Sequence, residues 1–167
     1  MKSSFVLAGI LVLALLSAAP PVQAFTAKNL DIAVQDTSDA VITFDYDLTW
    51  FEHAAVFMRI ADPGIELKKA LESSYGKPVV VTEADGAKSR FVVKGFASKQ
   101  ESNTTVTMKT PALSFEQAEK ILNRYWFAPL IVPDFSPEVT RVGFPDGYVE
   151  EFSNQISIPS IQHPLNM

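Results

Sequence analysis

Carboxylate side chains stand at spacings in this sequence that could support chemistry. Asp45 and Asp47 lie two positions apart in a segment that alternates polar and apolar residues, shortly after Asp36 and Asp39. Paired carboxylates can bind calcium or act as general acid and base. The alternation is more typical of the solvated face of a strand, and the glycine of a calcium-binding loop is missing here. We therefore expect an outer sheet face at these positions.

A second group of carboxylates lies nearer the C-terminus. Glu150 and Glu151 could form a glycosidase-like pair with Asp146, since that chemistry uses two carboxyl groups across a sugar. Adjacent residues of a strand face opposite sides, so Glu150 and Glu151 cannot both serve one site. Surface charge on a hairpin is the favoured interpretation.

The chain contains two histidines and no cysteine, which restricts metal and nucleophile chemistry. His53 and His163 are far apart in the sequence, and we interpret them as a polar residue at the start of a helix and a tail residue. The spacings typical of zinc sites, serine hydrolases and phosphate-binding loops are missing. Without cysteine there is no thiol catalysis and no disulfide. The sequence thus predicts no catalytic residue, no metal and no cofactor, and an enzyme is the less favoured class.

Large apolar side chains offer another candidate for a functional surface. The segments 50–58 and 125–135 contain more of them than two short elements ordinarily need for packing. Most should be core, and an exposed remainder would mark a surface for an envelope protein, a glycan or lipid head groups. The candidate binding residues are Trp50, Phe51, Met58, Trp126, Phe127 and Phe135.

One glycosylation sequon is present. Asn103, Thr104 and Thr105 match the acceptor pattern, in a segment that we expect to form an exposed loop. Asn103 is therefore a candidate site for a glycan if the host glycosylates its exported proteins.

The N-terminal segment is typical of a signal peptide. Lys2 is followed by an uncharged apolar run over 5–19, and small residues precede a cleavage point after Ala24. The run is shorter than the roughly 20 residues that span a bilayer, and the prolines that follow would interrupt a helix. We expect residues 1–24 to be removed and the rest to be secreted or placed in the extracytoplasmic envelope. The alternative is an uncleaved N-terminal anchor.

The charge balance argues against nucleic acid as a partner. Residues 1–24 contain a single charged side chain, Lys2, so the formal net charge changes from −5 to −6 when they are removed. Phosphate backbones are bound through basic patches, which this chain lacks. Residues 25–167 suit one domain held by core packing alone, with no transmembrane segment.

The periodicity of apolar residues indicates three hairpins and short additional strands. Tight turns are expected around 145–147 and at Asp85 and Gly86, where we expect the positive φ angles of a two-residue turn. The expected strands are 30–34 with 42–50, 79–83 with 89–97, 104–109, 139–144 with 148–152, and 156–158. We expect 128–137, which holds three prolines, to be an extended edge or surface loop.

Helices are expected between these hairpins. The first covers 51–61, the second begins at Pro63 and ends at Gly76, and the third begins with a capping box at Ser114 and continues to Tyr125. This order predicts the α+β class, an antiparallel sheet built from hairpins with two or three helices packed on one face.

The function favoured by these features is a non-enzymatic binding or interaction module of the cell envelope or extracellular space. The alternatives are an exported hydrolase that uses carboxylates such as Asp45, Asp47 or Glu52, and a carrier of an apolar small molecule. A concave pocket around the carboxylates would favour the hydrolase, and an aromatic cavity between helices and sheet would favour the carrier.

Overall fold

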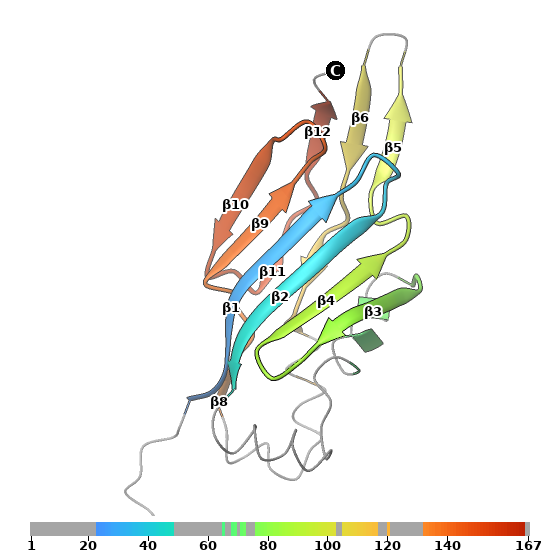
Figure 1. Cartoon of the computed structure of the whole chain (residues 1–167). Helices are drawn as coiled ribbons and strands as arrows, with labels where there is room; N and C mark the ends of the chain where they lie inside the picture. The colour runs from blue at the N-terminus through green and yellow to red at the C-terminus, as the bar shows by residue number, and fades with distance from the viewer. Residues whose placement is uncertain are drawn as a thin grey trace, which may run out of the picture.

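In the computed structural model of the chain, most of the described residues lie in β-strands (Figure 1). It covers residues 23–48, 76–102, 105–116 and 132–165, together with Ile65, Lys68, Lys69, Leu71, Glu72 and Lys120. Residues 1–22 of the expected signal peptide lie outside the described residues. Among the described residues, no helix is long and apolar enough to cross a membrane.

The N-terminal hairpin forms as the alternation predicts. β1 (Gln23–Val34) and β2 (Ala40–Leu48) pair antiparallel, with Ile32 opposite Ile42. Both of these side chains are buried, and so are the apolar residues two positions from each of them. A turn in which Ser38 has a φ of 69° joins the strands. The inward face of this hairpin is the centre of the fold.

Further strands extend this hairpin into a seven-stranded sheet. Its neighbours run in the order β10, β9, β1, β2, β4, β3, and β8 pairs with the beginning of β1. β1 is parallel to β8 and β9, whereas the remaining pairs are antiparallel. The added strands are β3 (Val79–Ala84), β4 (Lys88–Val93), β8 (Val132–Asp134), β9 (Val139–Gly143) and β10 (Val149–Ser153).

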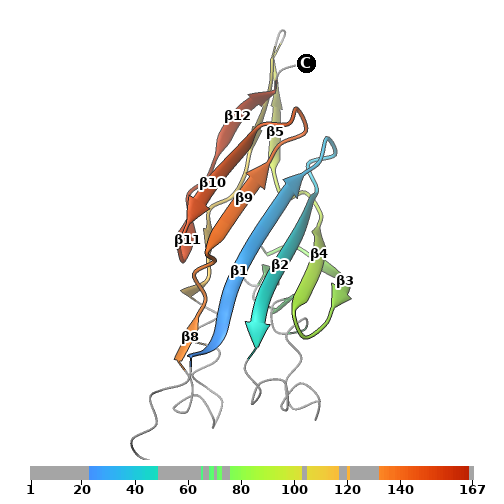
Figure 2. The ribbon, with the colours of Figure 1, turned by 60° about the vertical axis from the view of Figure 1, so that its left-hand side comes forward.

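Two smaller sheets lie behind the large one (Figure 2). One is three-stranded in the order β12, β6, β5, and the other pairs β11 with β7. Their strands are β5 (Ser98–Glu101), β6 (Val106–Lys109), β7 (Leu113–Ser114), β11 (Ser157–Ile158) and β12 (Gln162–Leu165). The described residues therefore form two layers of sheet.

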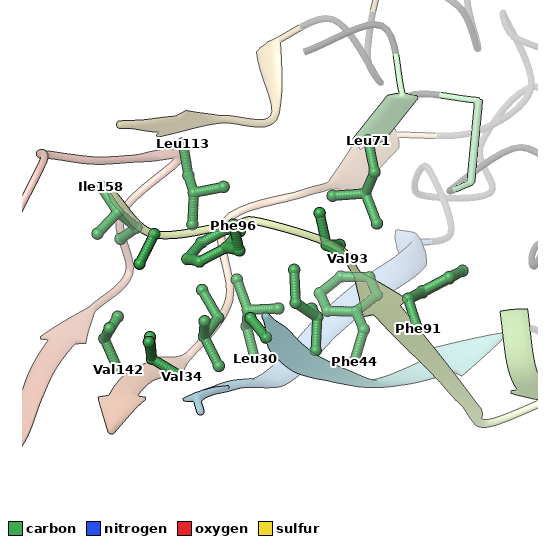
Figure 3. Packing of buried hydrophobic residues seen from close by; sticks show 14 of the residues in the cluster. Leu30, Val34, Phe44, Leu71, Phe91, Val93, Phe96, Leu113, Val142 and Ile158 are labelled. Carbon is green, nitrogen blue, oxygen red and sulfur yellow. The ribbon is translucent and has the colours of Figure 1, made fainter. Parts of the chain in front are cut away.

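The hydrophobic core fills the space between these layers. Figure 3 shows Val34, Phe44 and Phe91 from the large sheet in one cluster with Leu113 and Ile158 from the smaller strands. Each of these side chains is less than a tenth exposed. Burial of this kind stabilises the fold by about 25 cal/mol per Å² of apolar surface.

The expected α+β class is wrong. The described residues are a β-sheet-rich fold, and strands rather than helices supply the second layer over most of the core. Among the seven described residues with helical conformation, only Leu71 is buried in the core. The expected helix over 51–61 and most of the helix from Ser114 to Tyr125 lie outside the described residues.

The end of the second expected helix is described. Gly76 has a φ of 61° and donates its N–H to the carbonyl oxygen of Glu72 at 2.8 Å. A left-handed glycine that bonds back to the last turn is the usual end of a helix. The expected stop at Gly76 agrees with this geometry.

Two polar segments differ from the expectation. The polar stretch before residue 104 contains β5, and the tail contains β12 with His163, where loop and tail were expected. Main-chain pairing of both strands with β6 explains this, because polar side chains are tolerated at exposed sheet positions. The proline-rich segment forms the expected extended edge, since β8 pairs with β1, although Pro137 is fully buried rather than on a surface loop.

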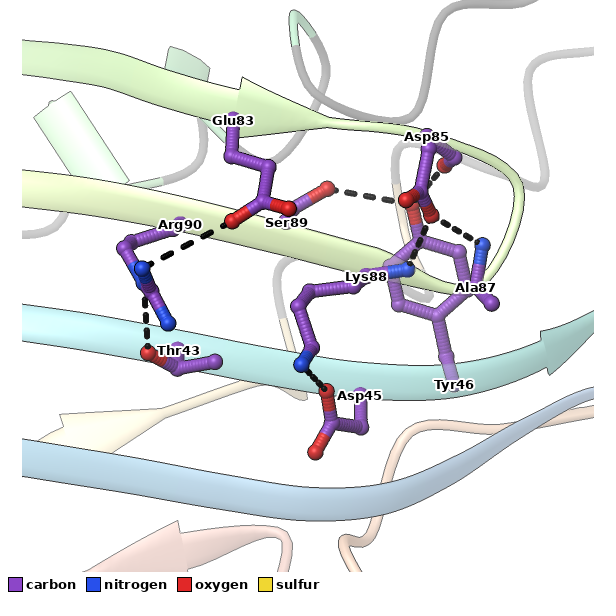
Figure 4. Close-up of polar contacts among 9 residues, drawn as sticks. All are labelled: Thr43, Asp45, Tyr46, Glu83, Asp85, Ala87, Lys88, Ser89 and Arg90. Carbon is purple, nitrogen blue, oxygen red and sulfur yellow. Dashed lines mark hydrogen bonds and ion pairs between the residues drawn. The ribbon is translucent and has the colours of Figure 1, made fainter.

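The turn between β3 and β4 also differs in detail. Gly86 is not among the residues with positive φ, so the expected two-residue turn is wrong. Instead the carboxylate of Asp85 accepts the N–H groups of Ala87 and Lys88, each at 2.7 Å (Figure 4). The hydroxyl of Tyr46 donates to the carbonyl oxygen of Asp85 at 2.7 Å and ties this turn to β2.

Acid should destabilise the fold through two turn carboxylates. The N–H of Gly95 and then the ammonium of Lys94 lower the pKa of Asp39, and the N–H groups of Ala87 and Lys88 lower the pKa of Asp85. A lowered folded-state pKa adds stability that is present above the unfolded pKa of about 3.9 and is lost as the pH falls through the folded value.

We therefore expect the free energy of unfolding in urea to fall when the pH is lowered from about 6 to about 3. The Asp39→Asn, Asp85→Asn double variant should show a shallower fall, because neither position then titrates. If the free energy of unfolding fell equally steeply with pH in that variant, other carboxylates would control the loss of stability in acid.

A buried hydroxyl offers a site where stability can be increased. Thr140 in β9 is 1% exposed, and its Oγ1 has no hydrogen-bond partner among the described residues. Because an unsatisfied polar group loses its hydration on burial, Thr140→Val should raise the free energy of unfolding by about 1 kcal/mol. Urea unfolding measures this change, and a loss of similar size would indicate a bridging water on the hydroxyl.

Candidate binding surface

The two layers meet at a cluster around His163. Its Nε2 lies 2.8 Å from Oδ2 of Asp146, which is in the turn between β9 and β10. The ring of Tyr148 stacks on the imidazole with centroids 4.2 Å apart and planes at 10°, and Phe144 is 4.9 Å away. The interpretation of His163 as a tail residue is therefore wrong, since it links β12 to the large sheet.

This cluster fits a structural role better than a catalytic one. The side chains of His163 and Asp146 are only 11% and 6% exposed. Oδ1 of Asp146 also accepts the N–H of Tyr148, which fixes the turn. No group of three potential metal ligands occurs among the described residues. The pair holds the layers together and leaves little surface for a substrate.

The outer face of the large sheet carries an ordered row of charges. Each member lies opposite the next in the strand register, from β10 across to β3. Arg141 Nε lies 2.9 Å from Glu151 Oε1, and its Nη1 lies 3.6 Å from Asp31 Oδ1. The hydrogen bond to Glu151 raises the pKa of Arg141. We call this row the charge ladder: Glu151, Arg141, Asp31, Thr43, Arg90 and Glu83.

The other half of the charge ladder crosses β2, β4 and β3 (Figure 4). Arg90 donates from Nε to Thr43 Oγ1 at 3.3 Å, and its Nη1 lies 3.7 Å from Glu83 Oε2. Exposed pairs of this kind contribute little stability individually. These pairs instead hold long side chains in fixed places across the sheet.

A row of small apolar residues runs beside the charge ladder on the same face. Its members are in register, two positions from the ladder on every strand except β3, where a register shift intervenes. Val80 and Val149, at the two ends, are 52% and 49% exposed. We call it the valine row: Val149, Gly143, Ala33, Val41, Val92 and Val80.

The middle of the valine row is also accessible. Ala33 is exposed, and Val41 and Val92 are half-buried. A Cβ added at Gly143 would meet Val149 Cγ2 at 3.9 Å, an ordinary contact, so packing does not require glycine there. The missing side chain leaves one side of Val149 uncovered. A contiguous apolar strip on a solvated face is typical of interaction surfaces.

The carboxylates singled out in the sequence also lie on this face. Asp45 Oδ1 is 3.6 Å from Lys88 Nζ, and Asp47 Oδ2 is 3.7 Å from the ammonium of Lys28. Each carboxylate therefore faces a lysine rather than a second acid. Lys28 also donates to Glu138 at 2.5 Å, and this bond raises the pKa of Lys28. The prediction that Asp45 and Asp47 lie on the outer face of a strand is confirmed.

The C-terminal acids are separated as strand geometry requires. Glu151 belongs to the charge ladder, whereas Glu150 lies on the opposite side, with Oε2 3.5 Å from the hydroxyl of Tyr148. Asp146 is engaged by His163. The three carboxylates do not converge, so the glycosidase-like arrangement is not formed.

Most of the candidate binding residues from the sequence fall outside the described residues. This applies to Trp50, Phe51, Met58, Trp126 and Phe127, and also to Asn103, His53 and Glu52. Phe135, which follows β8, is half-buried and packs against the core cluster.

Sequence reasoning missed the valine row, although a signal for it was present. Four strands contain runs of three apolar residues, at 32–34, 40–42, 79–81 and 91–93. If the first and third residues of such a run face the core, the middle residue must face outward. The middle residues are Ala33, Val41, Val80 and Val92, and all four belong to the valine row.

Comparison with known proteins gives no match at any level. No protein family, no curated protein and no solved structure resembles the chain significantly.

Proposed function

We propose that the chain is an exported, non-enzymatic binding module of the cell envelope or extracellular space, and that the outer face of its large sheet is the binding surface. The valine row is the observation that carries this proposal, because it exposes apolar surface where the sheet could have been polar throughout. The charge ladder beside it adds polar groups held in fixed places, as specific recognition needs.

The hydrolase alternative receives no support from this face. Asp45 and Asp47 would be its acids, yet each lies beside a lysine on an open sheet surface. General acid catalysis needs a carboxyl group that is shielded or paired with another acid. The carrier alternative requires an aromatic cavity between helices and sheet, and the expected helix over 51–61 and most of the helix from Ser114 to Tyr125 lie outside the described residues.

Export is the other part of the proposal. It rests on the apolar segment 5–19 and the small residues before position 25. Cleavage after Ala24 would remove the first two residues of β1 and keep the pair of Phe25 with Leu48. N-terminal sequencing of the secreted chain should therefore begin at Phe25, whereas a chain that retains Met1 in the membrane would contradict cleavage.

The binding surface is tested by changing its polarity while keeping its shape. The Val41→Thr, Val92→Thr double variant replaces two methyl groups by hydroxyls at half-buried strand positions. We expect it to fold, because Thr is also a strand former, and to retain envelope components about fivefold less than the wild-type chain.

Val106→Thr, a half-buried position in β6, is the matched control and should bind as the wild type does. Circular dichroism would establish that all variants fold. Equal binding by the wild type and the double variant would exclude the outer face as the binding surface.

A further inference from the structure

One side of β10 is open to pairing with a further strand, next to the proposed binding surface. The inference drawn from this edge rests on the proposed function. β10 pairs with β9 along one side, and no strand among the described residues pairs with its other side. Its five pairs with β9 continue without a register shift. A regular open edge offers unpaired main-chain groups to another strand.

The other sheet edges are less suitable for strand addition. β3 has a register shift between Val81 and Glu83, and a carboxylate oxygen of Glu72 accepts the N–H of Val79. β12 contains Pro164, which has no N–H to donate. The four residues of β5 are all exposed and polar, so they offer no apolar anchor. β10 is therefore a better-formed open edge than β3, β12 or β5.

Both rows of the outer face end on β10. Val149 closes the valine row and Glu151 closes the charge ladder, two positions apart and on the same side of the strand. Their side chains are 49% and 59% exposed. A strand added beside β10 would place one side chain next to each of them.

The sign of charge alternates along this end of the charge ladder, and this predicts the charge that a strand paired with β10 should carry opposite Glu151. Glu151 is negative, Arg141 positive and Asp31 negative, with contacts of 2.9 and 3.6 Å between neighbours. Arg141 uses Oε1 of Glu151, and Oε2 has no partner among the described residues. The next position in the series would be filled by a cation.

A second copy of the chain does not supply that cation. If two β10 strands pair antiparallel with full overlap, the two Glu151 residues at their centres lie opposite each other. If β10 of one copy continues the ladder into β3 of another, Glu151 lies opposite Glu83. Like charges in directly opposed positions destabilise strand pairing. The ladder thus disfavours self-association at this edge.

We propose that β10 accepts an extended segment of a partner protein as an additional strand, with Lys or Arg opposite Glu151 and a β-branched apolar residue two positions away opposite Val149. Main-chain hydrogen bonds supply affinity in such strand addition, and alternate side chains supply specificity. The partner is identified by this alternation of apolar and basic residues.

A titration with defined peptides tests this proposal. The first peptide has the sequence Thr-Val-Thr-Arg-Thr-Val-Thr, which presents valine on both sides of arginine and so suits either strand direction. The second replaces arginine by glutamate. Amide chemical shifts of the ¹⁵N-labelled chain should change in 149–153 with the first peptide at millimolar concentration, and its affinity should be about fivefold higher than that of the second.

A charge reversal makes the test specific. Glu151→Arg should invert the preference, so that the glutamate peptide binds more tightly. Glu101→Arg, which changes the charge equally on the β5 edge, should leave the preference unchanged. Sedimentation of the free chain provides the second measurement, and we expect a monomer.

Several results would overturn the proposal. The first is an absence of chemical shift changes in 149–153. The second is an equal loss of affinity for both peptides in Glu151→Arg, or an inverted peptide preference in Glu101→Arg. The third is a dimer of the free chain that forms through β10. If the Val41→Thr, Val92→Thr variant still loses envelope binding in that case, the outer face remains the binding surface and strand addition alone is excluded.

Discussion

Phe91→Ala is expected to lower the free energy of unfolding by about 3 to 5 kcal/mol, the usual cost of truncating a buried phenylalanine. Phe91 is 1% exposed on the inner face of β4, opposite Ile42 on one side and Val81 on the other. Its removal would leave a cavity where β2, β3 and β4 contribute to the core (Figure 3). Urea denaturation followed by circular dichroism measures the change.

Val92→Ala is the matched control for this prediction. Val92 is the next residue of the same strand and faces outward in the valine row. Its truncation should cost about 1 kcal/mol or less, because it loses strand propensity but little burial. Equal effects of the two substitutions would contradict the assignment of inner and outer faces on β4.

His163→Leu is expected to lower the free energy of unfolding by about 3 kcal/mol. The substitution removes the imidazole that bonds Asp146 Oδ2, although the carboxylate, which is 6% exposed, still accepts the N–H of Tyr148. It also removes the imidazole that stacks on Tyr148. The large effect follows from burial, because the same pair on the surface would contribute at most about 1 kcal/mol.

His163→Gln separates the hydrogen bond from the ring. Glutamine can still donate to Asp146, so this variant should recover roughly half of the loss, on the order of 1 to 2 kcal/mol. If His163→Leu unfolded at the same urea concentration as the wild type, the contact between β12 and the turn after β9 would not hold the layers together.

The hairpins could be predicted because alternation carries the information. Leu30, Ile32 and Val34 on one strand and Ile42 and Phe44 on the other are buried, as their two-residue period indicates. Turn residues such as Asp146 and Gly147 marked the ends of strands, and Gly147 has a φ of 88°. These signals are local, and local signals are visible in a sequence.

The second layer could not be predicted because its strands depend on pairing. Ser98–Glu101 and Gln162–Leu165 show no apolar alternation, and Pro164 argues against a strand. They are strands because β6 between them offers main-chain hydrogen bonds on both sides. Strands were expected over 104–109 and 156–158, but without their neighbours they do not indicate a second sheet, so helices were assigned to cover the core and the predicted class was wrong.

The candidate surface depends on register in the same way. Nothing in the sequence indicates that Arg141 lies between Asp31 and Glu151, because β1 and β9 are more than a hundred residues apart and pair in parallel. The outward direction of Asp45 and Asp47 was predictable from alternation, whereas their lysine partners were not. A row across six strands is a property of the sheet.

Site-specific crosslinking tests the central claim that the outer face of the large sheet is the binding surface. Because the chain has no cysteine, a single one can carry a benzophenone group at any chosen position. Ala33→Cys places it in the middle of the valine row, and Gln100→Cys places it at an exposed position of β5 in the other layer. Irradiation in the host's envelope fraction should give discrete crosslinked products from position 33 and none from position 100. Equal products from both positions, or products from position 100 alone, would contradict the claim.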